Sequence, residues 1–223
     1  NGNQKTTRLF LIMNNLKNDD TVALARRVLE IEGSALLKMA KDLPTDFTAT
    51  VEAILTTKGR VIVAGVGKSG HIGNKIAATL ASTGTPASFV HATEASHGDL
   101  GMVTSSDFCL LISNSGETTE LSDIVSHTSR FAIPMAAISS NPESTLMQAA
   151  NYKLTLTVAP EACSIGMAPT TSTTLTLALG DALAVALMER RDFCPEDFKV
   201  FHPGGKLGAR ISTVAQLMRP LSE

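Results

Sequence analysis

The chain has 223 residues, of which 43% are hydrophobic and 18% charged, and its formal net charge is −2. This length is enough for one domain with a sizeable core. The small net charge gives no reason to expect a nucleic acid or an anionic membrane as a partner. No run reaches the roughly 18 apolar residues of a membrane span, and no signal-peptide pattern opens the sequence. The apolar composition suits a homo-oligomer.

The three cysteines, Cys109, Cys163 and Cys194, form no CxxC pair and no even framework. A reducing, cytoplasmic setting is therefore expected. Residues 1–19 are expected to be a leader without fixed structure. Apolar residues at helical spacing predict a helix over 20–41, and a second helix is predicted over 45–57.

From residue 60 onward, strand-like and helix-like segments alternate. Strands are predicted at 60–64, 87–91, 108–112, 135–139 and 154–158, and helices at 70–83, 117–130, 143–150 and 170–191. This alternation indicates βαβ units and an α/β fold with a parallel sheet covered on both faces. The helix over 170–191 is apolar around much of its circumference, which favours packing at a subunit interface as well as on the sheet.

The first strand leads into a glycine-rich segment, Gly65-Val-Gly-Lys-Ser-Gly-His71. Its Gly-x-Gly-x-x-Gly pattern resembles a dinucleotide fingerprint, but the second strand ends at His91 without the acidic residue that would hold the ribose. A P-loop would need glycine where Ile62 stands. Tight turns without a ligand stay open as an explanation of the glycines, though not of Lys68 and Ser69 together.

The third strand leads into a second loop, Ser113-Asn-Ser-Gly-Glu-Thr-Thr-Glu120, which is dense in hydroxyl groups. Gly116 would let the backbone approach a ligand closely. The helix expected to begin at Glu117 would aim free N–H groups at the same place. Because both loops follow strands and precede helices, they predict an anion site, with phosphate as its occupant.

Six segments carry a resemblance to arabinose 5-phosphate isomerases of the sugar isomerase (SIS) domain family. They are Gly67-Lys-Ser-Gly-His-Ile-Gly73, Ala81-Ser-Thr-Gly-Thr-Pro86, Glu94-Ala-Ser-His-Gly-Asp-Leu-Gly101, Ile112-Ser-Asn-Ser-Gly-Glu117, Gly180-Asp-Ala-Leu-Ala-Val185 and His202-Pro-Gly-Gly-Lys-Leu-Gly208. The resemblance implies a three-layer, flavodoxin-like SIS fold with a five-stranded parallel sheet. It also implies interconversion of D-ribulose 5-phosphate and D-arabinose 5-phosphate through an enediol, supplying 3-deoxy-D-manno-octulosonate (Kdo) for lipopolysaccharide or capsule.

The resemblance assigns roles to named residues. It implies catalytic roles for Lys68, Glu120, Glu161 and His202. Glu161 is the preferred base, and His202 of one subunit is expected to reach a neighbour's site. Glu120 also has a plain structural explanation, because any carboxylate gains from a helix N-terminus. The implied substrate contacts are Ser69, Gly84, Thr85, His91, His97, Ser113, Asn114, Ser115, Gly116 and Thr118.

The spacing of His91, Glu94, His97 and Asp99 is compatible with a divalent metal. The resemblance makes His91 a zinc contact, and such a zinc is expected to inhibit, because the enediol route requires no cofactor. The hydroxyl residues 171–174 are expected to cap their helix, with sugar contacts as the alternative.

The resemblance divides the chain into the leader, an SIS domain over 20–212 and a tail over 213–223. The sequence stops where the paired CBS domains that many members carry would begin, which is expected either of a naturally short form or of a piece of a longer chain. For a naturally short form, feedback by CMP-Kdo in the substrate cleft is an additional hypothesis. A homotetramer is the expected assembly. Two alternatives stay open: an isomerase of another phosphosugar, and a non-catalytic sugar-phosphate sensor.

Overall fold

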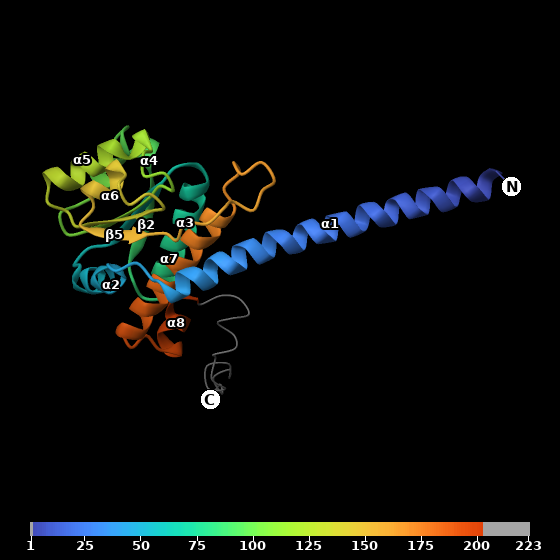
Figure 1. Ribbon diagram of the computed structural model, residues 1–223. Coiled ribbons are helices and arrows are strands. Elements are labelled where there is room, and N and C mark those ends of the chain that lie inside the picture. Colours follow the sequence, from blue (N-terminus) through green and yellow to red (C-terminus); the bar gives the residue numbers. More distant parts are fainter. Residues whose placement is uncertain (1, 203–223) are drawn as a thin grey trace, which may run out of the picture.

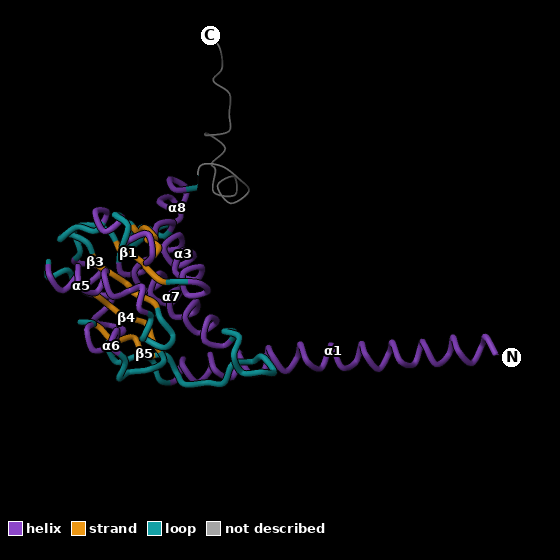
Figure 2. Tube along the Cα trace, turned by 90° about the horizontal axis from the view of Figure 1, so that it is seen from above, coloured by secondary structure: helices purple, strands orange, loops and turns teal. Residues whose placement is uncertain are grey.

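The computed structural model describes the backbone of residues 2–202 and the side chains of residues 20–202. Its centre is a five-stranded, wholly parallel sheet with the strand order β2-β1-β3-β4-β5 (Figures 1 and 2). The strands are β1 (Val61–Gly65), β2 (Ala87–His91), β3 (Phe108–Ile112), β4 (Met135–Ser139) and β5 (Tyr152–Thr155). The expected α/β fold with a parallel sheet is confirmed.

Helices cover both faces of the sheet, which gives three layers (Figure 2). One face is covered by α1 (Gly2–Lys41), α2 (Phe47–Thr56), α3 (Gly67–Ser82) and α7 (Thr171–Arg190). The other is covered by α4 (Ala92–Ala95), α5 (Ser122–Arg130) and α6 (Thr145–Ala149). The remaining elements are the short 3-10 helices η1 (Asp99–Met102) and η2 (Thr119–Leu121), and α8 (Pro195–Phe201).

The three central strands are buried along their whole length, because both of their faces are covered. Alternate residues of β3 show how this works. Phe108 and Leu110 pack in the cluster with α3 and α7, whereas Cys109 and Leu111 pack in the cluster with α5 and α6. A near-continuous apolar run is therefore what a central parallel strand requires. Burial also raises the pKa of the Cys109 thiol to about 12, as expected for a core cysteine.

Two strand boundaries differ from the expected ones. β1 begins at Val61 and not at residue 60, because the N–H of Arg60 donates to the Asp107 carboxylate (2.7 Å). β5 lies at Tyr152–Thr155 and not at 154–158. The ring of Tyr152 packs on Phe108 with centroids 5.8 Å apart, a contact that extends the strand toward its start and that a local pattern does not show.

Helix α1 begins at Gly2, not at residue 20, so the boundary drawn between a leader and the domain falls inside one helix. Ala35 and Met39, near its end, are buried in the cluster that contains α7. Its earlier part projects away from the sheet (Figure 1). There Val22, Leu24 and Leu29 are exposed, although they carry the apolar spacing of a packed helix.

Helix α7 is the one described helix whose length and apolar composition would allow it to cross a membrane. In this fold it is a core helix, because Leu175, Leu179, Leu183 and Leu187 are buried against the sheet layer. Gly180 lets α3 approach closely, since a Cβ there would lie 2.4 Å from side-chain atoms of Ile76. Residues 203–223, which include the expected tail, lie outside the described part.

The strand order places a topological switch point between β1 and β3. The chain leaves β1 toward β2 on one side, and leaves β3 toward β4 on the other. In open α/β sheets of this order, ligands bind at the carboxyl ends of the two strands that flank the switch. Gly65 and Ile112, the last residues of β1 and β3, lie directly opposite each other there.

Candidate active site

The segment after β1 forms the first turn of α3 and not a separate loop. Gly67, at φ +57°, makes the turn, and no atom lies within 4 Å of where its Cβ would be. Lys68 and Ser69 follow in the first helical turn, where the backbone N–H groups lack helical acceptors. A lysine is unfavourable beside the positive end of a helix dipole, so an anion bound between the two would stabilise this arrangement.

The loop after β3 holds its shape through its own hydroxyl groups. The N–H of Gly116 donates to the Ser113 hydroxyl (2.9 Å), and Ser113 Oγ lies 2.7 Å from Thr118 Oγ1. The N–H of Glu117 donates to the Ser115 hydroxyl (3.2 Å). Gly116, at φ +70°, adopts a backbone conformation that favours glycine. The hydroxyl groups therefore build the loop before they meet any ligand.

Backbone donors remain available in this loop. Within residues 20–202, the N–H groups of Ser115, Thr118 and Thr119 donate no hydrogen bond to the protein. Ser115 and Thr119 are exposed and Thr118 is partly exposed. Convergent free N–H groups in a tight loop form an anion-binding concavity. This arrangement agrees with the predicted phosphate loop.

A cleft of about 190 Å³ joins the two strand ends to α7. Its lining comprises Val66, Lys68, Ser69, Ile72, Asn114, Pro169, Ser172, Thr173 and Thr176. Lys68 and Ser69 come from α3, Asn114 from the hydroxyl loop, and Ser172 from the first turn of α7. The cleft therefore brings together the two segments that the sequence singled out, at the switch point of the sheet.

Glu161 caps helix α7 from outside it. Its Oε2 accepts hydrogen bonds from the N–H of Thr170 (2.7 Å), the hydroxyl of Thr170 (3.0 Å) and the N–H of Ser172 (3.3 Å). Burial tends to raise the pKa of Glu161, but the Ser172 hydroxyl and these hydrogen bonds outweigh it, so the pKa is lowered. The expectation that residues 171–174 cap their own helix is wrong, because no side-chain cap is present at Thr170 and Glu161 supplies it.

Glu120 lies in the 3-10 helix η2, because the helix expected over 117–130 becomes regular only at Ser122. Its side chain is exposed, and Oε2 accepts a hydrogen bond from the Thr119 hydroxyl (3.2 Å). Of the two candidate carboxylates, Glu120 is thus the one with fewer hydrogen bonds from the protein.

The two expected histidine contacts lie at the carboxyl edge of the sheet. His91 ends β2, and its Nδ1 accepts a hydrogen bond from the N–H of Thr93 (3.3 Å). His97 follows α4 and is exposed. Among the side chains of residues 20–202, no three His, Cys, Asp or Glu are close enough to share a metal ion. The spacing around His91 therefore does not become a complete metal site within the described residues of one chain.

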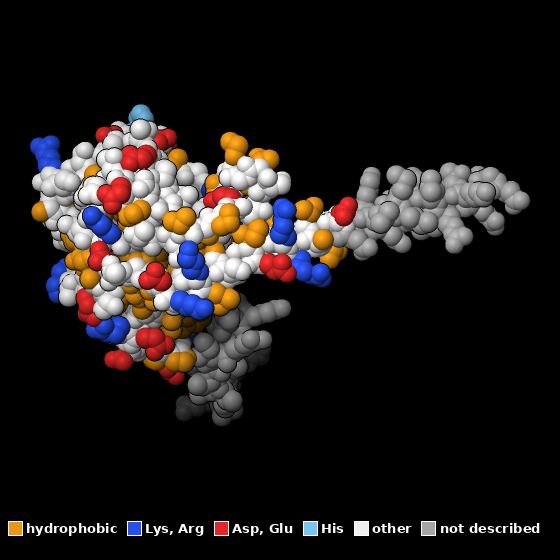
Figure 3. Space-filling model, viewed as in Figure 1, with side chains coloured by type: hydrophobic (Ala, Val, Ile, Leu, Met, Phe, Trp, Pro, Cys, Tyr) orange, Lys and Arg blue, Asp and Glu red, His pale blue; other side chains and the backbone are white. Residues whose placement is uncertain are grey.

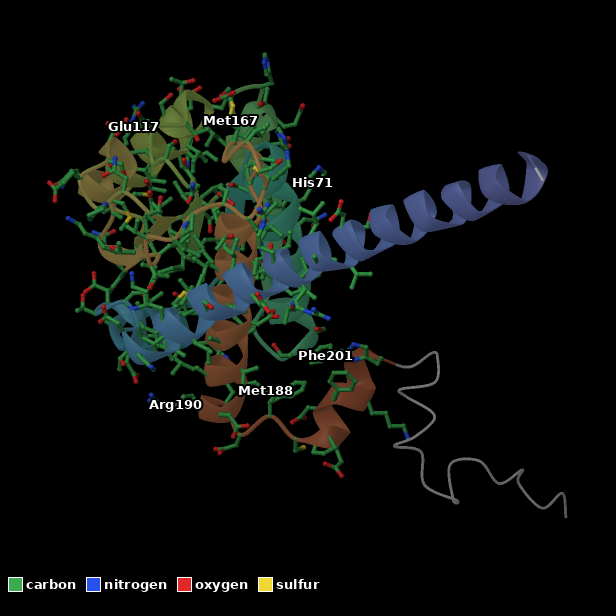
Figure 4. All side chains as sticks on the ribbon, turned by 45° about the vertical axis from the view of Figure 1, so that its right-hand side comes forward. His71, Glu117, Met167, Met188, Arg190 and Phe201 are labelled. Atoms are coloured by element: carbon green, nitrogen blue, oxygen red, sulfur yellow. The ribbon has the colours of Figure 1, made fainter. Side chains whose placement is uncertain are left out.

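Three expected site residues, Gly84, Thr85 and His202, lie at the opposite edge of the sheet. Gly84 and Thr85 precede β2, and the Thr85 hydroxyl accepts a hydrogen bond from Arg191 (3.2 Å), just past the end of α7. A 20-residue helix such as α7 is about 30 Å long, and its first turn lines the cleft. Figure 4 shows Met167 and His71 at one end of the molecule and Arg190 and Phe201 at the other.

His202 belongs to that far end. Its ring stacks on Phe198 with centroids 3.8 Å apart, and its Nδ1 donates to the Phe198 carbonyl (2.9 Å). The structure thus does not bring His202, Gly84 or Thr85 to Lys68 within one chain. The rest of the motif that begins at His202 lies outside the described residues.

The sequence analysis missed Glu117 as a structural residue. Its carboxylate accepts hydrogen bonds from the N–H and the hydroxyl of Thr145, both 2.8 Å long. The partner lies 28 residues away, so no local pattern shows it. The Ser139 and Ser140 hydroxyls, which donate to the Asn114 carbonyl, were missed for the same reason.

Comparison with known proteins shows the family of this chain. The model of the SIS domain family matches residues 54–186. The arabinose 5-phosphate isomerase KdsD of Pseudomonas aeruginosa is 50% identical over 89% of this chain and 61% of its own length. The KdsD of Yersinia pestis is 54% identical over 83% of this chain and 57% of its own length. The chain thus spans about three fifths of these relatives.

A solved structure extends the likeness to three dimensions. The Escherichia coli CFT073 protein c3406, in complex with arabinose 5-phosphate, is 38% identical, with a TM-score of 0.81. The match covers 83% of this chain and 99% of that one. The family model covers more than half of the chain, and the parallel sheet flanked by helices matches the fold of that solved structure. The chain belongs to the SIS domain family.

Proposed function

We propose that this chain is an aldose–ketose isomerase that interconverts D-ribulose 5-phosphate and D-arabinose 5-phosphate. The observation that carries the proposal is the cleft that joins Lys68 to the hydroxyl loop. Its lining includes the Lys68 cation and Asn114, the second residue of the hydroxyl loop, so a phosphate held by that loop would place the sugar near a cation, as a reacting carbonyl requires. The identity of 50–54% with proteins named arabinose 5-phosphate isomerase supports this substrate.

The hydroxyl loop binds the phosphate in this proposal. The free N–H groups of Ser115, Thr118 and Thr119, with the hydroxyl of the exposed Ser115, would surround the phosphate oxygens, while the buried Ser113 hydroxyl would hold the loop from within. Anchoring the phosphate fixes where C1 and C2 lie, which turns proton transfer into an intramolecular step. Lys68 would then stabilise the developing enediolate oxygen as a cation.

A carboxylate moves the proton between C1 and C2. The open alternatives are Glu161 and Glu120, and their surroundings differ. Glu161 has a lowered pKa and one oxygen occupied by the start of α7, so it is a weak base with a clear positioning role. Glu120 is exposed and accepts only the Thr119 hydroxyl among the described residues. We therefore assign the proton transfer to Glu120 and the shaping of the cleft to Glu161.

A second subunit completes the site in this proposal. His202, Gly84 and Thr85 lie at the far end of α7, so they reach a cleft only from a neighbouring copy. The exposed apolar residues of α1, with Ile165 and Met167 on the loop before α7, offer surface for such an assembly (Figure 3). A homotetramer in the cytoplasm that supplies Kdo synthesis for lipopolysaccharide or capsule is the arrangement we propose.

Two ligands other than the substrate belong to the proposal. A zinc ion on the free Nε2 of His91 would inhibit, with the other donors coming from the ligand or a neighbouring copy, and no step passes through it. CMP-Kdo would compete for the substrate cleft. Titrating each against activity is the test. Inhibition by zinc that persists in His91→Asn, or no competition by millimolar CMP-Kdo, contradicts the respective part.

The main test is an isomerase assay with D-ribulose 5-phosphate. Lys68→Met is expected to lower kcat/KM by at least about 100-fold, the usual effect of losing a group that stabilises charge in the transition state. The matched control is Lys58→Met, because Lys58 is exposed and lies before β1 at the opposite edge. Equal activity of the two variants would contradict the role of Lys68.

The assay also separates the alternatives. Glu120→Gln is expected to lose about 100-fold or more in kcat, and Glu161→Gln to lose activity together with thermal stability. The reverse pattern would return the base to Glu161. A wild-type protein that binds the sugar phosphate without turnover would be a sensor. Turnover of only another phosphosugar would identify a different isomerase.

A further inference from the structure

Beyond its first residue, Ser113, the hydroxyl loop is attached to the body of the domain at three places. The Asn114 carbonyl accepts hydrogen bonds from the hydroxyls of Ser139 (3.0 Å) and Ser140 (2.9 Å) at the end of β4. The Gly116 carbonyl accepts one from the N–H of Leu146 (3.1 Å). The Glu117 carboxylate accepts two from Thr145, at the first residue of α6.

All the N–H groups at the N-terminus of α6 have acceptors in the protein. The first four N–H groups of a helix have no acceptor within the helix. In α6, the N-cap Ser144 donates to the Asn141 carbonyl, Thr145 to the Glu117 carboxylate, Leu146 to the Gly116 carbonyl and Met147 to the Ser144 side chain. No donor of this turn remains for a ligand, and two of the four hold the loop.

We propose that Glu117 is a positioning residue that locks the hydroxyl loop onto helix α6 and so keeps its N–H groups in the geometry that binds phosphate. The inference rests on the proposed function of the loop as the phosphate site. Glu117 lies between Gly116, which packs directly against Ser144, and Thr118, whose N–H donates to no described residue. A displaced Glu117 would therefore shift the donors on either side of it.

Because Glu117 is charged, its two possible influences on phosphate binding have opposite signs, and the proposal can be tested by whether its substitution tightens or weakens that binding. A carboxylate beside a phosphate repels it, so removal of that charge by itself would tighten phosphate binding. Loss of the attachment would weaken binding, because the donors would no longer be held in place. The side chain is exposed (Figure 4), so substitution leaves the core intact.

The experiment measures the binding of inorganic phosphate by calorimetry together with KM and kcat. Glu117→Ala is expected to weaken phosphate binding and to raise KM by roughly fivefold, the usual effect of losing one net hydrogen bond. The effect on kcat is expected to be smaller. Glu117→Gln retains an acceptor for the Thr145 N–H and a donor to its hydroxyl, so it should restore most of the affinity.

Two substitutions of Thr145, the hydrogen-bond partner of Glu117, test the same attachment. Thr145→Val keeps the shape and the N–H but loses the hydroxyl, whereas Thr145→Ser keeps both groups. The valine variant is expected to weaken phosphate binding by about twofold or more, and the serine variant to behave like wild type. Amide exchange at Thr145 should also become faster in Glu117→Ala, a readout that needs no ligand.

The outcomes separate this inference from the proposed function. Unchanged or tighter phosphate binding in Glu117→Ala, with wild-type binding intact, overturns the positioning role alone. Phosphate binding by Glu117→Gln that is as weak as that of Glu117→Ala also overturns the positioning role. The charge of Glu117, and not its hydrogen bonds to Thr145, would then determine the phosphate affinity. A wild-type protein that binds no phosphate overturns both proposals.

Discussion

The substitution Gly116→Ala tests how tightly the hydroxyl loop is built. Gly116 has φ +70°, and a Cβ there would lie 1.9 Å from Ser144 Oγ and 2.3 Å from Ser144 Cβ. Ser144 is fully buried and so has no room to swing away. An L-residue in the left-handed region costs about 1–2 kcal/mol, and the forced contact adds roughly 1–3 kcal/mol. The variant should thus lose about 2–5 kcal/mol of unfolding free energy.

Gly166→Ala is the matched control for the backbone contribution. Gly166 has φ +66°, and no atom lies within 4 Å of its virtual Cβ. An alanine there would therefore have the free-energy cost of the left-handed backbone conformation without a steric contact of its Cβ. The difference between the two variants should be about 1–3 kcal/mol, or roughly 2–12 °C in Tm for a domain of this size. Scanning calorimetry of both variants measures it.

Ser144→Gly should relieve most of the contact, because it removes the two nearest of the three atoms that a new Cβ at residue 116 would meet and leaves only Ser139 Oγ at 3.0 Å. In a double-mutant cycle the pair should recover about 1–3 kcal/mol relative to the sum of the single changes. The reasoning is refuted if Gly116→Ala is no less stable than Gly166→Ala, or if the two changes simply add. Phosphate affinity should follow the same order as stability.

Two further substitutions test the frame around the site. Burial tends to raise the pKa of Asp107, but hydrogen bonds from Arg60 and Thr104 outweigh this effect and lower the pKa below the ordinary value of 3.8. The ionised Asp107 therefore stabilises the folded state fully above pH 3.8. This stabilisation is lost as the pH falls through the lower pKa of the folded state. Asp107→Asn should cost about 1–3 kcal/mol at neutral pH and less in acid, and a constant difference in pH-dependent denaturation would count against this account. Gly180→Ala should be roughly 1 kcal/mol less stable, because overpacking against Ile76 exceeds the gain in helix propensity; a more stable variant in urea denaturation would contradict the close contact.

The sequence predicts the sheet well because central parallel strands must be apolar on both faces. β2, β3 and β4 lie at the expected residues. It also predicts one anion site from the two loops, and the structure shows that the strands before them are neighbours. What it could not show are contacts between distant segments. The attachment of Glu117 to Thr145 and of Glu161 to the start of α7 each depends on folding, although the residue types are typical of helix caps.

The roles of the acidic residues changed most. A carboxylate after a strand suggests a base when it is read alone, and Glu161 was expected to be one. In the structure its oxygen is occupied by donors from Thr170 and Ser172, which favours a positioning role. The place of His202 could not be worked out from one chain, because a helix of about 30 Å separates its end of the domain from the cleft.

That separation has a consequence for mixtures of damaged subunits. In the assembly proposed above, helix α7 would hold one half of the site at its start, and its other end, through α8, would offer the second half to a neighbour. A subunit without Lys68 still supplies His202, and a subunit without His202 still supplies Lys68. Hybrid assemblies of two inactive variants should therefore contain some intact sites and regain part of the activity. Because of the length of α7, each copy would thus contribute residues to a neighbour's site and receive residues from a neighbour in its own.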